Sequence, residues 1–237
     1  MNKTLTAVAT LAIATVSSTL LGAEITGKVT LTGTPPPERE ITPIKADAKC
    51  GAAHTAPVMT RSFVKGDGDG LANVWVYVTE GLPAGKTYEV PKSKPVVDQV
   101  GCMYEPFVSA VMAGQPFAVK NSDPFMHNVN AMAKLNKGFN FAQSTQGQEN
   151  EKTFDKAENV KFVCNVHPWM SGYVRVFENP FFAVTDKDGK FTISGDLPDG
   201  KYTVEAEHLK AGKVTGTVEV KGGKATLALS LAVPAAK

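Results

Sequence analysis

Hydrophobic and polar residues alternate in the segment 25–31, as they do in a strand with one buried face. Other short runs rich in Val, Thr and aromatic residues follow, such as 73–79. Turns rich in Gly, Pro and Asp separate these runs, for example at 66–70 and 186–189. We expect no helix after residue 24. Short strands at close spacing predict an all-β protein of the sandwich type. The remaining predicted strands are 58–65, 104–111, 117–120, 139–141, 153–154, 160–164, 173–177, 182–185, 190–194, 201–207, 213–220 and 224–232.

The composition is that of a protein with a folded core, and it argues against two classes of function. The 237 residues are 43% hydrophobic, and 25 Lys and Arg against 23 Asp and Glu leave a net charge of +2. A near-neutral chain without a basic cluster argues against nucleic-acid binding as its main function. Three cysteines without a Cys-x-x-Cys-His motif exclude covalently attached c-type haem.

Residues 1–23 have the pattern of a secretory signal peptide. Lys3 precedes an apolar run from Ala7 to Leu21, and Ala23 stands at the predicted cleavage position. A membrane anchor is the alternative, but hydroxyl residues between positions 15 and 19 interrupt the run. We therefore expect a periplasmic or secreted protein that begins near Glu24, without stable membrane insertion of the mature chain.

Four residues carry the chemistry that we expect: His127, Cys164, His167 and Met170. The last three lie in one seven-residue segment after an apolar strand, and His127 lies near the end of another strand. Two imidazoles and a thiolate with a weak axial thioether are the ligands of a type 1, blue copper site. Structural zinc seldom takes a Met ligand. A chance assembly of these residues is the alternative, but the strand contexts and the predicted export favour a metal site.

The same residues resemble a known family. The segment Cys-Asn-Val-His-Pro-Trp-Met at 164–170, and His-Asn-Val at 127–129, resemble the ligand loops of amicyanin-like and plastocyanin-like cupredoxins. The resemblance covers roughly residues 96–178. It implies a Greek-key β-sandwich that holds one type 1 copper ion and carries single electrons. It also implies that Asn128 ties the two ligand loops together.

A second resemblance concerns the rest of the chain. The segment 185–204 resembles carboxypeptidase regulatory-like, transthyretin-like β-sandwiches, and residues 25–29 and 72–78 resemble the opening strands of that fold. We therefore expect the cupredoxin part to be inserted into a second, smaller sandwich. A cupredoxin with an N-terminal extension and a C-terminal appendage is the simpler alternative. The combination also resembles secreted proteins labelled as methylamine-utilisation proteins. The predicted parts are a signal peptide (1–23), N-terminal strands of the second sandwich (24–95), the copper domain (96–178) and the regulatory-like sandwich (179–237).

Cys50 and Cys102 are the two cysteines outside the ligand loop, and we expect them to pair because an oxidising compartment disfavours free thiols. We expect a disulfide that joins the N-terminal segment to the first cupredoxin strand. A second metal site formed by Cys50, His54 and Cys102 is the alternative. We expect His208 to be structural.

The predicted function is single-electron transfer between redox partner proteins whose identity the sequence does not name. His167 should expose one ring edge, and an apolar docking patch should surround it. The alternative is a copper carrier or store. An enzyme is not expected, because multicopper enzymes place additional His ligands beside the thiolate, whereas Val163 and Asn165 flank Cys164. The predicted docking patch consists of Phe125, Met126, Pro168 and Trp169.

Overall fold

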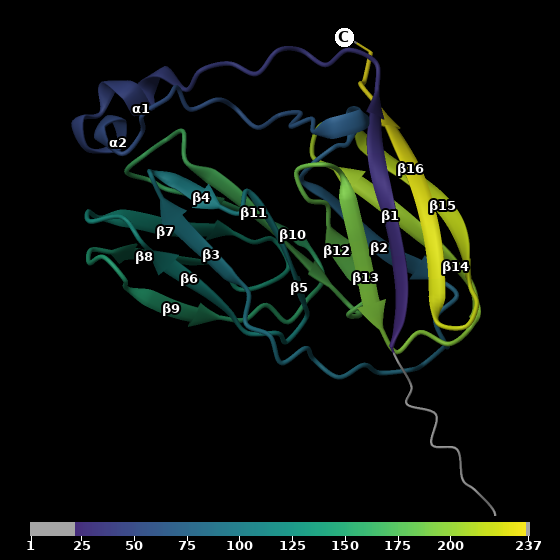
Figure 1. Cartoon of the computed structure of the whole chain (residues 1–237). Helices are drawn as coiled ribbons and strands as arrows, with labels where there is room; N and C mark the ends of the chain where they lie inside the picture. Colours follow the sequence, from purple (N-terminus) through teal and green to yellow (C-terminus); the bar gives the residue numbers. More distant parts are fainter. Residues whose placement is uncertain (1–21, 236–237) are drawn as a thin grey trace, which may run out of the picture.

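The computed structural model describes residues 22–235, which form four β-sheets arranged as two sandwiches (Figure 1). The fold is all-β, as the sequence predicted. The predicted signal peptide lies outside the described residues except for its end, and Ala23 is the first residue of strand β1. No helix in the described part of the chain has the length and apolar character needed to cross a membrane.

The first sandwich, which we call the terminal sandwich, is built from both ends of the chain. Strands that precede residue 96 pair directly with strands that follow residue 181: β1 runs parallel to β16, and β2 runs antiparallel to β14. The intervening residues form the other sandwich. One sheet contains β13 (Lys190–Gly195), β1 (Ala23–Thr32) and β16 (Lys224–Ala232); the other contains β12 (Phe182–Val184), β2 (Val74–Glu80), β14 (Gly200–His208) and β15 (Gly212–Val220).

The second sandwich, which we call the central sandwich, also has two sheets. The segment predicted as one strand at 104–111 is divided at Pro106 between β4 and β5, which belong to different sheets. The larger sheet contains β5 (Val108–Met112), β11 (Ser171–Phe177), β10 (Asn159–Val163), β7 (His127–Met132) and β8 (Phe139–Gln143); the smaller contains β4 (Met103–Glu105), β3 (Val96–Val100), β6 (Phe117–Asn121) and β9 (Glu149–Lys152).

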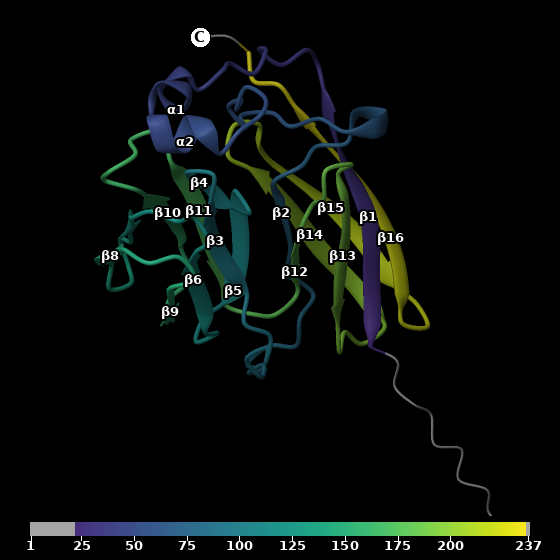
Figure 2. The ribbon, with the colours of Figure 1, turned by 60° about the vertical axis from the view of Figure 1, so that its left-hand side comes forward.

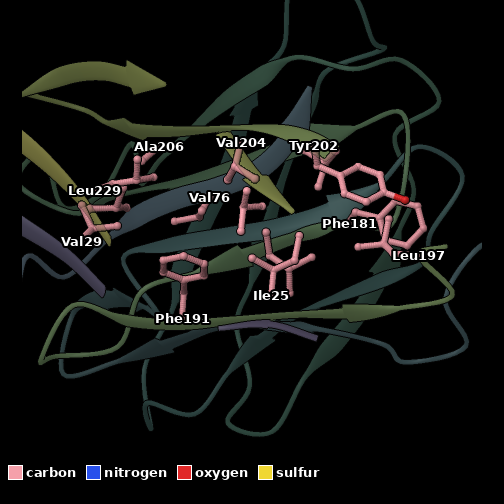
Figure 3. Packing of buried hydrophobic residues seen from close by; sticks show 14 of the residues in the cluster. Ile25, Val29, Val76, Phe181, Phe191, Leu197, Tyr202, Val204, Ala206 and Leu229 are labelled. Carbon is pink, nitrogen blue, oxygen red and sulfur yellow. The ribbon is translucent and has the colours of Figure 1, made fainter. Parts of the chain in front are cut away.

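Each sandwich has its own apolar core. In the terminal sandwich, Ile25 and Phe191 from one sheet face Val76 and Val204 from the other, and Phe181 closes one end (Figure 3). In the central sandwich a separate cluster of aromatic and Val side chains includes Cys164 and Met170. Two of the four predicted ligands, Cys164 and Met170, therefore belong to the core of the central sandwich.

The two sandwiches lie side by side (Figure 2) and contact each other through polar as well as apolar groups. The indole Nε1–H of the fully buried Trp75 donates to the carbonyl of Ser109 at 2.9 Å. Arg175 on β11 forms an ion pair with Glu207 on β14. Tyr77 packs on Phe177, with 4.8 Å between ring centroids. These contacts fix the central sandwich against the terminal one.

Two short helices correct the expectation that no helix follows residue 24. Helix α1 spans Thr42–Ala46 and α2 spans Ala48–Ala52, and both lie at one end of the central sandwich (Figure 1). Pro43 stands in the first turn of α1, and the Asp47 carboxylate accepts hydrogen bonds from the first N–H groups of α2 at 2.9 Å. Five-residue helices are too short to produce a helical hydrophobic period, so the pattern did not reveal them. A 3-10 turn spans Asp67–Asp69.

The predicted strand at 58–65 is also wrong. The segment has only isolated bridges, at Met59 and Lys65. The Glu38 carboxylate accepts the backbone N–H groups of Ser62 and Phe63. Because a side chain satisfies these donors, the segment does not need a neighbouring strand there.

His208 has a structural environment. It is 3% exposed, and its Nδ1 accepts the backbone N–H groups of Lys210 and Ala211 at 3.3 and 3.1 Å. Burial lowers the pKa of His208 to about 4, while the nearby Glu38 carboxylate acts in the opposite direction. The folded protein therefore favours the neutral imidazole.

This burial predicts a loss of stability in acid. Between pH 6.5 and pH 4, His208 is protonated in the unfolded chain but stays neutral in the folded chain. The free energy of unfolding should therefore fall by up to about 3 kcal/mol as the pH falls through this range. His208→Asn keeps a side-chain acceptor without titrating. Urea unfolding at pH 7 and pH 4.5 should show a smaller pH dependence for the variant, and equal dependence in both proteins would contradict the prediction.

Candidate metal centre

Two neighbouring strands bring the predicted ligands together. His127 is the first residue of β7, and Cys164 directly follows β10, which pairs with β7. His167 and Met170 lie in the loop that joins β10 to β11. This loop is stabilised from within, because Cys164 N–H donates to the Met170 carbonyl at 3.2 Å and Met170 N–H donates to the His167 carbonyl at 2.9 Å.

The donor atoms of His127, Cys164 and His167 all lie within 4.8 Å of one another. The Nδ1 atoms of the two imidazoles are 3.0 Å apart, and Cys164 Sγ is 3.6 Å from His167 Nδ1. With metal–nitrogen and metal–sulfur bonds of about 2.0 and 2.3 Å, a shared metal places two nitrogens about 3.4 Å apart and a nitrogen and a sulfur about 3.7 Å apart. The three residues therefore fit one small, soft metal ion such as copper.

All four predicted ligands are buried. Exposed fractions are 0% for His127, 2% for Cys164, 6% for His167 and 0% for Met170. Met170 belongs to the same core cluster as Cys164. A metal held by these residues would be shielded from water.

The surroundings of Cys164 favour its thiolate. Burial raises the pKa of this thiol. A hydrogen bond with His127 and the backbone N–H groups of the two ligand loops lower the pKa by more than burial raises it, so the pKa lies below its usual value. One of these groups is Asn128 N–H, which is 3.3 Å from Sγ. The thiolate is the form of Cys that binds metals, so the site favours the form needed for binding.

Asp123 holds the other side of the His127 ring. His127 Nε2–H donates to Asp123 Oδ2 at 2.7 Å, which leaves Nδ1 directed toward His167. Burial raises the pKa of Asp123, but the hydrogen bonds from His127 and from the backbone N–H groups of Cys102 and Gly101 lower it overall. A carboxylate on the outer nitrogen sets the tautomer and orientation of a His ligand.

Asn128 and Tyr104 connect the two ligand loops. Asn128 Oδ1 accepts Asn165 N–H at 3.2 Å, and Asn128 Nδ2 donates to the Phe141 carbonyl at 3.1 Å. The buried Tyr104 hydroxyl lies 3.0 Å from the Asn128 carbonyl and 3.3 Å from that of Val163. Each group therefore contacts the segments on both sides of the site.

Cys50 and Cys102 form a disulfide with 5.6 Å between Cα atoms. It joins α2 to the turn between β3 and β4, and both residues are fully buried. The histidine whose ring nitrogen lies near both sulfurs is His167, whereas His54 Nε2 contacts the Gly101 carbonyl at 2.7 Å. Cys164 is the free cysteine of the chain.

The helical segment and the disulfide change the expected surface of the site. A ring nitrogen of His167 lies within 4.8 Å of both disulfide sulfurs, and the Trp169 ring centroid is 5.2 Å from that of His167. With 6% exposure, His167 does not present the exposed ring edge that we expected. The folded segment that carries Cys50 covers the imidazole, an effect that the ligand spacing alone does not reveal.

The four residues of the predicted docking patch differ in exposure. Pro168 is exposed and Met126 is 45% exposed, whereas Phe125 and Trp169 are half-buried against the cluster beneath the helices. Val166, also 45% exposed, lies in the same ligand loop.

Sequence reasoning did not assign roles to Asp123 and Tyr104. Asp123 stands four residues before His127, and an acidic residue so close to a candidate ligand was an available signal. Tyr104 is 60 residues from Cys164, and no local pattern relates them.

No family model and no curated protein matches the chain. Among solved structures, it is similar to a copper-containing nitrite reductase from Thermus scotoductus SA-01 (23% identity, 42% of this chain, 25% of that chain, TM-score 0.35). It is also similar to a purple cupredoxin from Nitrosopumilus maritimus (23% identity, 35% of this chain, 99% of that chain, TM-score 0.31). A third similar structure is a Cu(I) form of an amicyanin mutant (27% identity, 37% of this chain, 86% of that chain, TM-score 0.32). These neighbours are cupredoxins, matched over less than half of the chain. At these TM-scores, the interpretation of the site rests on its own geometry.

Proposed function

We propose that this chain is a type 1 copper protein that carries single electrons between redox partners. The observation that carries the proposal is the buried convergence of two imidazole nitrogens and one thiolate, within 4.8 Å of one another. With Met170 in the same loop, these are the ligand types of a blue copper site. Copper would supply the one-electron couple. The proposed ligands are His127, Cys164, His167 and Met170.

The surrounding residues favour electron transfer because they restrict rearrangement. Asp123 orients the His127 ring, and Asn128 and Tyr104 hold the two ligand loops together. The disulfide and Trp169 cover His167. A geometry fixed in advance needs little movement when the charge of the site changes. A carrier that releases copper would need a more open site, and this argues against the alternative function, a copper carrier or store.

Electron exchange would take place at the surface nearest Trp169 rather than at a bare histidine edge. Val166 and Pro168 are exposed in the same loop as Trp169, Met126 is exposed next to His127 in the chain, and the Trp169 ring lies 5.2 Å from the His167 ring. A small apolar surface suits brief encounters between redox proteins. Phe125 would support this surface from beneath.

We further propose that the terminal sandwich is a transthyretin-like module that holds the copper domain as an insertion. The pairing of β1 with β16 and of β2 with β14 supports this arrangement. The signal-peptide pattern of residues 1–23 supports a periplasmic or secreted location, and the Cys50–Cys102 disulfide agrees with an oxidising compartment.

The decisive test compares electron exchange with copper release. Purified protein loaded with Cu(II) is first reduced. Its reoxidation by a small inorganic oxidant is then compared with copper loss to a Cu(I) chelator, both followed by stopped-flow absorbance. We expect reoxidation to be much faster than copper loss. If copper leaves as fast as electrons, the carrier function replaces the proposed one.

Met170→Gln provides a narrower test of Met170 as a proposed copper ligand. Gln can occupy a similar volume and offers a harder oxygen donor, so the variant should keep copper and visible colour while its reduction potential falls. Voltammetry measures the potential. Met132→Gln, at an exposed methionine on β7, is the matched control and should leave the potential unchanged. An unchanged potential in Met170→Gln would remove Met170 from the ligand set.

A further inference from the structure

A second group of soft donors lies directly beside the first. Cys50 Sγ, Cys102 Sγ and a ring nitrogen of His167 are within 4.8 Å of one another, and all three residues are buried. In this structure the two sulfurs are joined as a disulfide and therefore offer no thiolate. We propose that reduction of this disulfide creates a Cu(I) site formed by Cys50, Cys102 and His167.

The proposed site follows from the positions of its donors. The disulfide bond already holds the two sulfurs together, and folding alone brings His167 to them from the ligand loop. Two thiolates and one imidazole form a soft donor set that suits Cu(I). Reduction by a dithiol transfers two electrons and two protons to the disulfide, giving two thiols and one oxidised dithiol. Binding of Cu(I) then displaces the two thiol protons.

His167, and not His54, completes this site. His54 is nearer to Cys50 in sequence, but its Nε2 is 2.7 Å from the Gly101 carbonyl. Within residues 22–235 the His167 ring bonds to no carbonyl, and its Nδ1 faces the first site. One imidazole is therefore shared between the two sites, so copper in one changes the ligands available to the other.

An open cavity lies close to this buried group, although its donors do not line it. A cavity of about 490 Å³ is lined by His54, Gly101, Asp123 and two methionines, Met59 and Met103. Gly101 is the neighbour of Cys102 in the chain, and Met103 packs in the same cluster as the disulfide. Met59 is 41% exposed, so a thioether stands at the solvent side of the cavity. Thioethers are soft donors, so the two methionines place groups that suit Cu(I) near the proposed site.

The proposal goes beyond the electron-transfer function and can be tested without it. Cys164→Ser removes the thiolate of the first site and leaves Cys50, Cys102 and His167 in place. Metal-free Cys164→Ser is prepared in two forms: untreated, and treated with dithiothreitol that is then removed without oxygen. After unfolding, thiol titration should find no thiol in the untreated form and two thiols in the treated form. The far-UV circular dichroism spectra of the two native forms should be the same.

Cu(I) binding is measured by competition with a chromophoric Cu(I) chelator. The reduced form should take one tightly bound Cu(I) per chain, and the disulfide form none. Adding Cys102→Ser should abolish this binding. His167→Asn should weaken it at least about tenfold, because losing a ligand costs no less than losing an outer-shell partner. His54→Asn, the matched control, should leave it unchanged.

Three results would overturn the proposal. The first is equal Cu(I) binding by the reduced and disulfide forms. The second is weakening by His54→Asn without weakening by His167→Asn. The third is a disulfide that cannot be reduced without loss of the β-sheet signal, which would show that the folded chain never presents the dithiol. If the second site binds Cu(I) but copper-loaded wild-type protein shows no visible colour, only the proposed electron-transfer function fails.

Discussion

Replacing Cys164 by Ser is expected to abolish the visible colour of the copper-loaded protein while leaving its fold intact. Intense absorption at about 600 nm is the signature of a Cys thiolate bound to Cu(II) in a blue copper protein. A serine hydroxyl cannot supply this thiolate. It can still accept the Asn128 N–H that now points at Sγ, so the loop keeps its hydrogen bond. Visible spectra after addition of Cu(II) and an oxidant measure the effect.

Asn165→Ser is the matched control for this experiment. Asn165 is the next residue in the chain, but it is exposed and bonds to the Asn130 side chain. The control should have the full visible absorption, and both variants should have the circular dichroism of the wild type. A Cys164→Ser protein that remained blue would contradict the proposed ligand set.

Asp123→Asn is expected to weaken copper binding and raise the reduction potential. The Asp123 carboxylate accepts three N–H groups, from Gly101, Cys102 and His127. An amide would turn its own N–H₂ toward one of these donors. Loss of an outer-shell partner of a His ligand costs about 10- to 100-fold in metal affinity. Loss of a nearby negative charge favours the less charged reduced site, by on the order of 100 mV.

Asp98→Asn removes the same charge without touching the site. Asp98 lies on β3, where it accepts the Ser122 hydroxyl at 2.7 Å and is near Lys120. This control should bind copper with wild-type affinity and shift the potential much less. Affinity is measured by chelator competition, and potential by voltammetry. If Asp123→Asn and Asp98→Asn behave alike, Asp123 acts only through its general charge and does not position His127.

These two variants test residues that were found in different ways. Cys164 was identified from the sequence, because a thiolate, an imidazole and a thioether within seven residues form a local signal. Asp123 emerged from the structure, since its contacts with Cys102 and His127 join segments that local periodicity treats separately. Tyr104 is a further case, with one hydroxyl that reaches the backbone on both sides of the site.

The amino-acid sequence was sufficient to predict the all-β class and most of the strands. Strand patterns depend on neighbouring residues, and those after residue 181 agree closely with the structure. It also determined the candidate ligands in one loop, because their spacing is local. The Cys50–Cys102 pair followed from elimination, since the third cysteine stood in that loop.

How the site is covered, and what lies beside it, depends on contacts between segments that are far apart in the sequence. Helix α2 begins at the Asp47 cap, and the two short helices bury Ile44 and Cys50; a hydrophobic period does not reveal either feature in segments of five residues. Folding then brings Cys50 and Cys102 against His167, more than 60 residues away along the chain. Such contacts arise from the packing of separate segments around a shared core. For this reason the buried His167 ring and the second group of soft donors could not be derived from local spacing.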